Sequence, residues 1–115
     1  MTALHPSLAG GRWFTLSLLD QLGNVGSEVG RASRRAATDP AASRRALERA
    51  LELLDLTIAD PRWRDRLKEL TRAREVLCDA AEGGRSYGST LADMERYFFP
   101  FALAARRRAL EAPKP

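Results

Sequence analysis

The sequence predicts an all-α protein, an up-down-up-down antiparallel four-helix bundle that we expect to be oligomeric. Alanine, leucine, arginine and glutamate dominate and β-branched residues are few, which favours helix along nearly the whole chain. Apolar residues recur at the three- and four-residue steps of an amphipathic helix in four segments. The connections between these segments are short, and short connections favour antiparallel neighbours.

The first predicted helix, over residues 12–37, carries two parallel stripes. One has the spacing of a helix-packing seam and consists of Leu18, Leu22, Val25, Val29, Ala32 and Ala36. The other follows one position later and is made mostly of small residues, among them Gly23, Gly26, Gly30 and Ser33.

The small-residue stripe requires a reason, because each glycine inside a helix costs about 1 kcal/mol relative to alanine. Close approach of another helix provides one. For Gly23 and Gly26 we expect that helix to belong to the same chain. For Gly30 and Ser33 the same helix of a second subunit remains an equal alternative.

Three further helices are predicted over residues 40–59, 61–81 and 91–112. Asp39-Pro40 and Asp60-Pro61 each combine an N-cap residue with a proline suited to the first helical turn. At the second of these junctions the alternative is one kinked helix. Thr90 and Asp93 resemble a capping box before the last helix. The bundle thus spans residues 12–112, between an irregular arm over 1–11 and a frayed tail over 113–115.

The composition indicates a soluble, basic, cytoplasmic protein. No apolar run has the roughly 20 residues that span a bilayer, and the first residues lack a signal-peptide pattern. A single cysteine, Cys78, suits a reducing compartment. With only one histidine, His5, the chain offers no zinc constellation, and we expect no metal and no cofactor.

The net charge is +4, and seventeen of the 19 basic residues are arginine. In an antiparallel bundle the end of the first helix meets the start of the second, and the start of the third meets the end of the fourth. Two clusters at opposite ends are therefore candidate anion- or nucleic-acid-binding sites. The first comprises Arg31, Arg34, Arg35, Arg44 and Arg45, and the second Arg62, Arg64, Arg66, Arg106, Arg107 and Arg108.

Other polar and aromatic residues interrupt the apolar pattern. Glu28 and Arg74 are candidates for a polar pair across the core, a role that more often fixes packing than performs catalysis. Tyr97 and Phe99 flank the core residue Phe98 and are candidates for a subunit interface. Trp13 and Trp63 should lie near the same end of the bundle.

The segment from Leu18 to Val29, in which Gln21-Leu22 is followed by small residues and Glu28, resembles small bacterial four-helix-bundle proteins. These are the 23S rRNA intervening-sequence proteins and the accessory variability proteins of diversity-generating retroelements. The match covers about a tenth of the chain. The resemblance implies a ring-forming, basic adaptor with no catalytic residue to transfer. The Arg-then-His motif of HEPN ribonucleases is missing.

Three functions follow as hypotheses. The first is a non-enzymatic bundle that self-associates and binds nucleic acid or an acidic protein surface through its arginine-rich ends. The second is a purely structural protein–protein interaction module that does not bind nucleic acid. The third is an enzyme with a polar site in the bundle core, built on Glu28 and Arg74.

Overall fold

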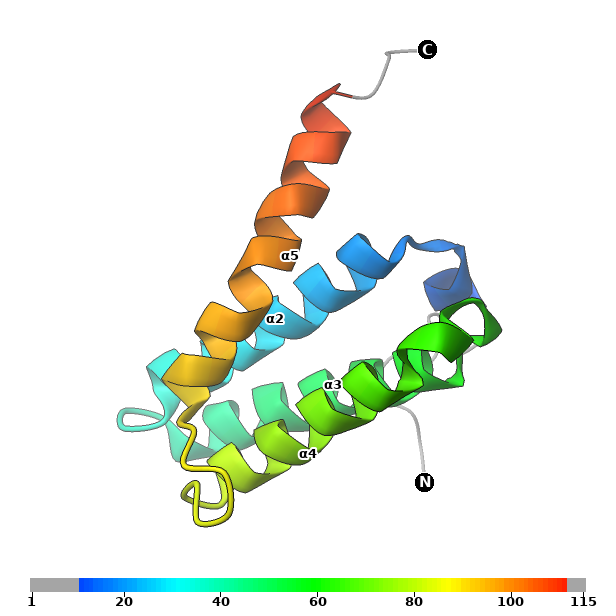
Figure 1. Ribbon diagram of the computed structural model, residues 1–115. Coiled ribbons are helices and arrows are strands. Elements are labelled where there is room, and N and C mark those ends of the chain that lie inside the picture. The colour runs from blue at the N-terminus through cyan, green and yellow to red at the C-terminus, as the bar shows by residue number, and fades with distance from the viewer. Residues whose placement is uncertain (1–10, 112–115) are drawn as a thin grey trace.

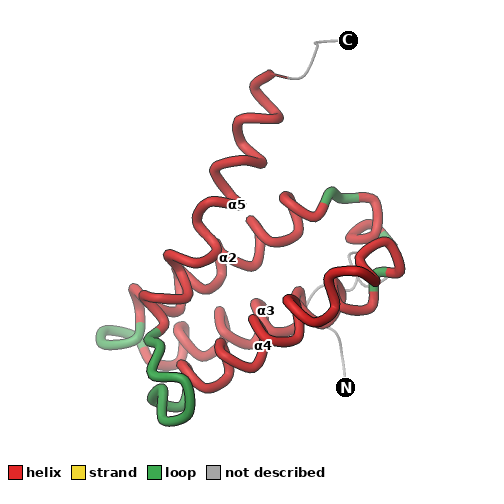
Figure 2. Tube along the Cα trace, in the orientation of Figure 1, coloured by secondary structure: helices red, strands yellow, loops and turns green. Residues whose placement is uncertain are grey.

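The computed structural model of the chain describes residues 11–111, and all regular secondary structure in that range is helical (Figures 1 and 2). The predicted arm over 1–11, with His5, lies outside the described residues except for Gly11, and so does the tail over 113–115. The described elements are η1 (Arg12–Thr15), α2 (Leu18–Arg35), α3 (Pro40–Ala59), η2 (Pro61–Arg66), α4 (Leu67–Ala81) and α5 (Leu91–Glu111).

Helix α2 is the centre of the fold, because its two most extensive contacts are with α3 and with α5. Helices α3 and α4 lie side by side, whereas α5 crosses α2 and its C-terminal turns project away from α3 and α4 (Figure 1). The all-α prediction and the packing of four helices as a bundle are therefore confirmed for the described chain. The core between these helices is formed mainly by Trp13, Leu22, Val25, Val29, Leu53, Leu54, Leu70, Leu77, Met94 and Phe98.

The small-residue stripe of α2 is where α5 approaches. A Cβ atom on Gly26 would lie 2.7 Å from the Cβ atom of Phe98, and one on Gly23 would lie 3.1 Å from the Cα atom of Ala102. Real side chains do not fit at the first distance and are tight at the second. The predicted contact within the chain is confirmed for Gly23 and Gly26.

Gly30, for which a subunit contact was an alternative, also faces α5 within the same chain. A Cβ atom there would lie 2.6 Å from Oε2 of Glu95. Ser33, one turn further, is half-buried. The stripe therefore receives α5 over at least two helical turns.

The first helix begins later than predicted, at Leu18 rather than near residue 12. The side chain of Ser17 caps it by accepting a hydrogen bond from the backbone N–H of Asp20. Leu16, between η1 and α2, has extended backbone angles of −80° and 150°. Composition alone did not predict this break, because it does not show where a serine side chain binds the backbone and starts a new helix.

Helices α3 and α4 are separate, so the alternative of one kinked helix is wrong. Asp60 has extended backbone angles of −73° and 116°, and its side chain accepts from the backbone N–H of Arg62. The predicted helix over 61–81 starts as the 3₁₀ segment η2, with Trp63 outside helical geometry, and becomes α-helical only at Leu67.

The connection from α4 to α5 is held by two carboxylates. Asp79 accepts hydrogen bonds from the backbone N–H groups of Ser86 and Tyr87, which lower the pKa of Asp79. The side chain of Asp93 accepts a hydrogen bond from the backbone N–H of Thr90. In return, the hydroxyl of Thr90 accepts one from the backbone N–H of Asp93. The predicted capping box is confirmed, and α5 then continues through Pro100.

Candidate anion-binding surface

The end of α2 and the start of α3 form a basic hollow. Asp39 caps α3 through the backbone N–H of Ala42, and the hydroxyl of Ser43 donates to the carbonyl of Ala32 at 2.6 Å. These bonds fix the first turn of α3 against the last turns of α2. The resulting α2–α3 hollow, of about 280 Å³, is lined by Arg31, Arg35, Ala42, Arg45, Ala46 and Arg49.

Glu28 pairs with two of the arginines that line this hollow. It is 8% exposed and forms ion pairs with Arg31 and with Arg49, the latter at 2.8 Å. Arg35 and Arg45 are exposed, and within residues 11–111 neither has an ion-pair partner. Two of the four guanidinium groups are thus partly neutralised and two are available to a ligand.

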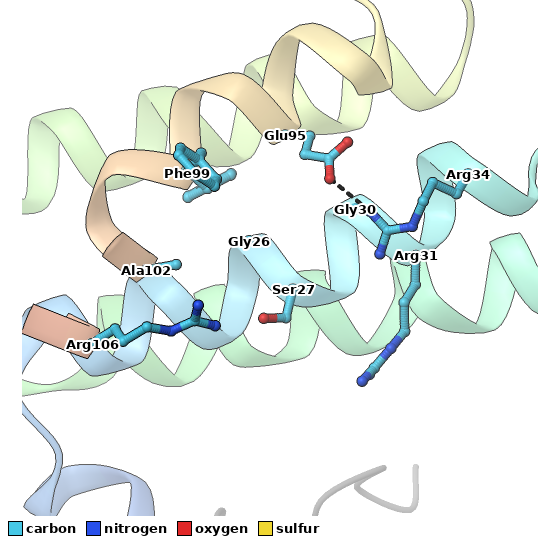
Figure 3. A pocket seen from close by; sticks show the side chains of 10 residues that line it. Gly26, Ser27, Gly30, Arg31, Arg34, Glu95, Phe99, Ala102 and Arg106 are labelled. Carbon is cyan, nitrogen blue, oxygen red and sulfur yellow. Dashed lines mark hydrogen bonds and ion pairs between the residues drawn. The ribbon is translucent and has the colours of Figure 1, made fainter. Parts of the chain in front are cut away.

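A second hollow, the α2–α5 groove of about 290 Å³, adjoins the first and shares Arg31 with it. Gly26 and Gly30 are among its lining residues, and Figure 3 shows Ser27, Arg106 and Phe99 around it. Arg34 donates to Glu95 across the groove at 2.8 Å. The groove thus combines cationic groups with one exposed aromatic ring.

The first predicted arginine cluster is brought together in part. Arg31, Arg35 and Arg45 line the α2–α3 hollow, while Arg34 and Arg31 line the α2–α5 groove. Arg44 is exposed but lines neither. Arg49 was missed, although its position one turn after Arg45 on the same face of α3 signals it. Arg49 lies within α3 rather than at its end, where the predicted cluster was sought.

The second predicted cluster does not form as expected, because α5 crosses α2 and its end projects away from η2 (Figure 1). Arg106 lines the α2–α5 groove instead, and Arg108 lines a small hollow with Ser17 and Asp20. Arg66 lies 3.6 Å from Glu69. Arg64 and Arg107 are exposed.

Arg62 has a structural role. Its guanidinium donates to Asp60 and, at 2.6 Å, to the carbonyl of Leu16, and it lies over the ring of Trp63. The bond to Arg62 lowers the pKa of Asp60 to about 2. These contacts occupy Arg62, so it does not belong to a ligand-binding set.

Glu28 and Arg74 do not form the expected pair, and each has other ion-pair partners. Arg74 of α4 reaches Asp55 of α3 at 2.6 Å, whereas Glu28 is held by α2 and α3 arginines. The reason is the order of packing: α2 contacts α3 and α5 extensively, and α4 packs against α3. Glu28 and Arg74 therefore do not share a polar site.

The aromatic residues of α5 divide between the core and the surface. Tyr97 contacts Phe98 edge-to-face at 5.0 Å between ring centroids, and partial burial raises the pKa of Tyr97. Phe99 is 61% exposed at the wall of the α2–α5 groove. Leu103 and Leu110 are also exposed on α5.

Residues 11–111 contain no helix long and apolar enough to span a membrane. Within the same range, no group of three or more histidine, cysteine, aspartate or glutamate side chains is placed to hold a metal ion. Comparison with protein-family models, curated proteins and solved structures found no match. The resemblance to ring-forming bacterial bundles stays a prediction.

Proposed function

We propose that this chain is a non-enzymatic antiparallel bundle of up-down-up-down topology that binds an anionic partner through the α2–α3 hollow. The observation that carries the proposal is four arginines, from two helices, around one hollow, of which, within residues 11–111, only Arg31 and Arg49 are paired with a carboxylate, Glu28. Guanidinium groups bind phosphate and carboxylate through paired hydrogen bonds. Arg35 and Arg45, which have no ion pair in the described chain, are the groups that would contact the partner first.

Nucleic acid is the partner we favour over an acidic protein surface. The α2–α3 hollow and the α2–α5 groove share Arg31, and a line of cations along both suits a backbone with regularly spaced charges. An acidic protein would need its carboxylates arranged to fit the same line. The purely structural interaction module remains the alternative, and it predicts no binding to either nucleic acid.

The test is salt-dependent binding of a fluorescein-labelled RNA and a DNA of the same sequence, measured by anisotropy. We expect affinity to fall linearly with salt on logarithmic axes, because bound phosphates release counterions. The double variant Arg35→Gln/Arg45→Gln should weaken binding. It should also reduce the slope of log affinity against log salt concentration by about 2, or about 1 per phosphate contact.

The matched control is Arg64→Gln/Arg85→Gln. Both residues are exposed, neither lines the hollow, and the net charge changes equally. An equal loss in both double variants would show that only overall charge matters and would overturn the assignment of this hollow. Binding to neither nucleic acid would remove the nucleic-acid partner.

We also propose that copies of the chain associate through the outward face of α5. Leu103 and Leu110 lie two turns apart on one face of α5, and the last turns of α5 project beyond the bundle (Figure 1). Leu110 is 81% exposed. A leucine seam on a projecting helix is completed most simply by the same seam of a second copy.

A further inference from the structure

We propose that the α2–α5 groove binds single-stranded nucleic acid, with one base stacked on Phe99 and adjacent phosphates bound by Arg106 and Arg31. The inference rests on the proposed binding of an anionic partner. It adds the form of the nucleic acid and a residue that reads an unpaired base. Its central observation is an exposed aromatic ring and arginines lining the same groove.

The groove has room for a planar group beside the ring. The hollow measures about 290 Å³, and Ala102 contributes only a methyl group to its lining. Phe99 lies at the wall of the groove (Figure 3), and it is largely exposed and accessible to a base. Phe99 does not belong to the buried core cluster of the described residues.

The cations of the groove are not equally available. Arg34 is bound to Glu95, and Arg31 is partly neutralised by Glu28. Arg106 has no ion-pair partner within residues 11–111, and its side chain extends from α5 toward Ser27 (Figure 3). Glu95 disfavours an anion on its own side. These charges place the phosphates toward Arg106 and Ser27 rather than toward Glu95.

The spacing of the two principal groups on α5 fits a nucleotide chain. Phe99 and Arg106 are two turns apart on one helix face, and a rise of about 1.5 Å per residue separates them by about 10 Å. One base on the ring and a phosphate of a neighbouring nucleotide on the guanidinium can then be bound together. From Arg106 the strand continues past Arg31 into the α2–α3 hollow.

A double helix does not satisfy this site. Paired bases already stack on their neighbours, so their faces are not available to Phe99. Unpaired bases stack on exposed aromatic side chains without sequence preference, and loss of one such ring typically weakens binding by roughly five- to one-hundred-fold.

The experiment compares oligodeoxythymidine, oligouridine of the same length and a DNA duplex, each fluorescein-labelled, with the full chain. We expect Phe99→Leu to weaken binding of both single strands about tenfold and to leave duplex binding and the salt slope unchanged. Arg106→Gln should instead reduce the salt slope for the single strands by about 1. Phe99→Trp should retain affinity, and its added tryptophan emission should be quenched when a base stacks on it.

Tyr87→Leu is the matched control, because Tyr87 is an exposed aromatic residue beside Arg72 on a different surface. Unchanged single-strand affinity in Phe99→Leu, with loss in Arg35→Gln/Arg45→Gln, would overturn the inference and leave the proposed function standing. A Phe99→Leu variant that keeps its affinity but has a lower mass in solution would assign the ring to a subunit interface instead. Loss of duplex binding equal to that of single strands would also contradict a stacked base.

Discussion

Gln21 of α2 donates a hydrogen bond from Nε2 to Oδ2 of Asp60 at 3.1 Å, and both side chains are buried. The same amide nitrogen donates to the carbonyl of Trp13 at 2.9 Å, while its Oε1 accepts from the indole of Trp63 at 2.9 Å. All the hydrogen-bonding groups of the Gln21 side chain are thus satisfied, and its amide can adopt only one orientation.

This cluster joins η1, α2 and η2 at one end of the bundle. Trp13 adds a bond from its indole to Oγ1 of Thr57 on α3, at 3.1 Å. The prediction that Trp13 and Trp63 lie near the same end is confirmed. Because these side chains hydrogen-bond to one another, a substitution at one of them should destabilise the packing of the whole end of the molecule.

We expect Asp60→Asn to lower the free energy of unfolding by about 2 kcal/mol at neutral pH. The substitution removes the charge that Arg62 and Gln21 bind, and hydrogen bonds to charged groups contribute about 1.5–3 kcal/mol. Urea unfolding measures the difference. Asp65→Asn, at an exposed position on η2, is the control and should change stability by less than about 0.5 kcal/mol.

The contribution of Asp60 should also depend on pH. Its pKa is lowered from 3.8 to about 2 in the folded chain, so its stabilising contribution is complete above pH 3.8 and is lost as the pH falls toward 2. The difference in stability between the wild type and Asp60→Asn should therefore shrink across that interval. A constant difference from neutral pH to pH 2 would show that the Asp60 charge is not the cause.

Alanine substitutions along the small-residue stripe should rank by what the new methyl group meets. Gly26→Ala places it 2.7 Å from the Cβ atom of Phe98, and we expect a loss of about 1–3 kcal/mol because α5 must shift. Gly23→Ala, 3.1 Å from the Cα atom of Ala102, should lose less.

Gly30→Ala is the internal control of that series. The new methyl group meets the flexible end of Glu95, which can move away, and the exposed Arg34–Glu95 pair contributes little. The gain in helix propensity, about 1 kcal/mol, should make this variant as stable as the wild type or slightly more stable. Thermal unfolding gives the order, and a Gly30→Ala variant less stable than Gly26→Ala would contradict the observed approach of α5.

Helical periodicity was sufficient to predict the four helices and the face of α2 that receives α5, because burial of an amphipathic face follows a fixed repeat. The break at Ser17 and the 3₁₀ start at Pro61 were not predictable in this way. Both depend on single side chains, Ser17 and Asp60, which bind backbone N–H groups and override propensity.

The candidate site was predictable only where two helix ends are neighbours in the chain. Arg31, Arg35 and Arg45 are joined by a short turn, so their proximity follows from the sequence. The place of Arg106 depends on the crossing of α5 over α2, which packing decides. The partner of Glu28 likewise depended on which helices touch, and sequence spacing contains no such information.

Self-association through α5 should be sensitive to charge on its outward face. We expect Leu103→Glu/Leu110→Glu to reduce the mass in solution toward the 12.7 kDa of one chain, because two exposed leucines would be replaced by like charges facing each other. Light scattering measures it. Leu67→Glu, an exposed leucine on α4, is the control and should leave the mass unchanged. A wild-type mass of one chain at all concentrations would refute this interface.

Replacement of Glu28 should move stability and ligand binding in opposite directions. In Glu28→Gln the buried carboxylate that holds Arg31 and Arg49 becomes neutral, so we expect a loss of about 1–3 kcal/mol in the free energy of unfolding. The same change frees two guanidinium groups beside the α2–α3 hollow and should strengthen nucleic-acid binding several-fold at low salt, with a steeper salt slope.

The comparison variant is Asp55→Asn, which removes a carboxylate from the Arg74 ion pair on α3 and α4, away from the hollow. It changes the net charge equally and should leave the slope as it is. Urea unfolding and anisotropy titrations on the same samples separate the two effects. If Glu28→Gln lost stability without any gain in affinity, Glu28 would be a packing residue and Arg31 and Arg49 would not contact the ligand.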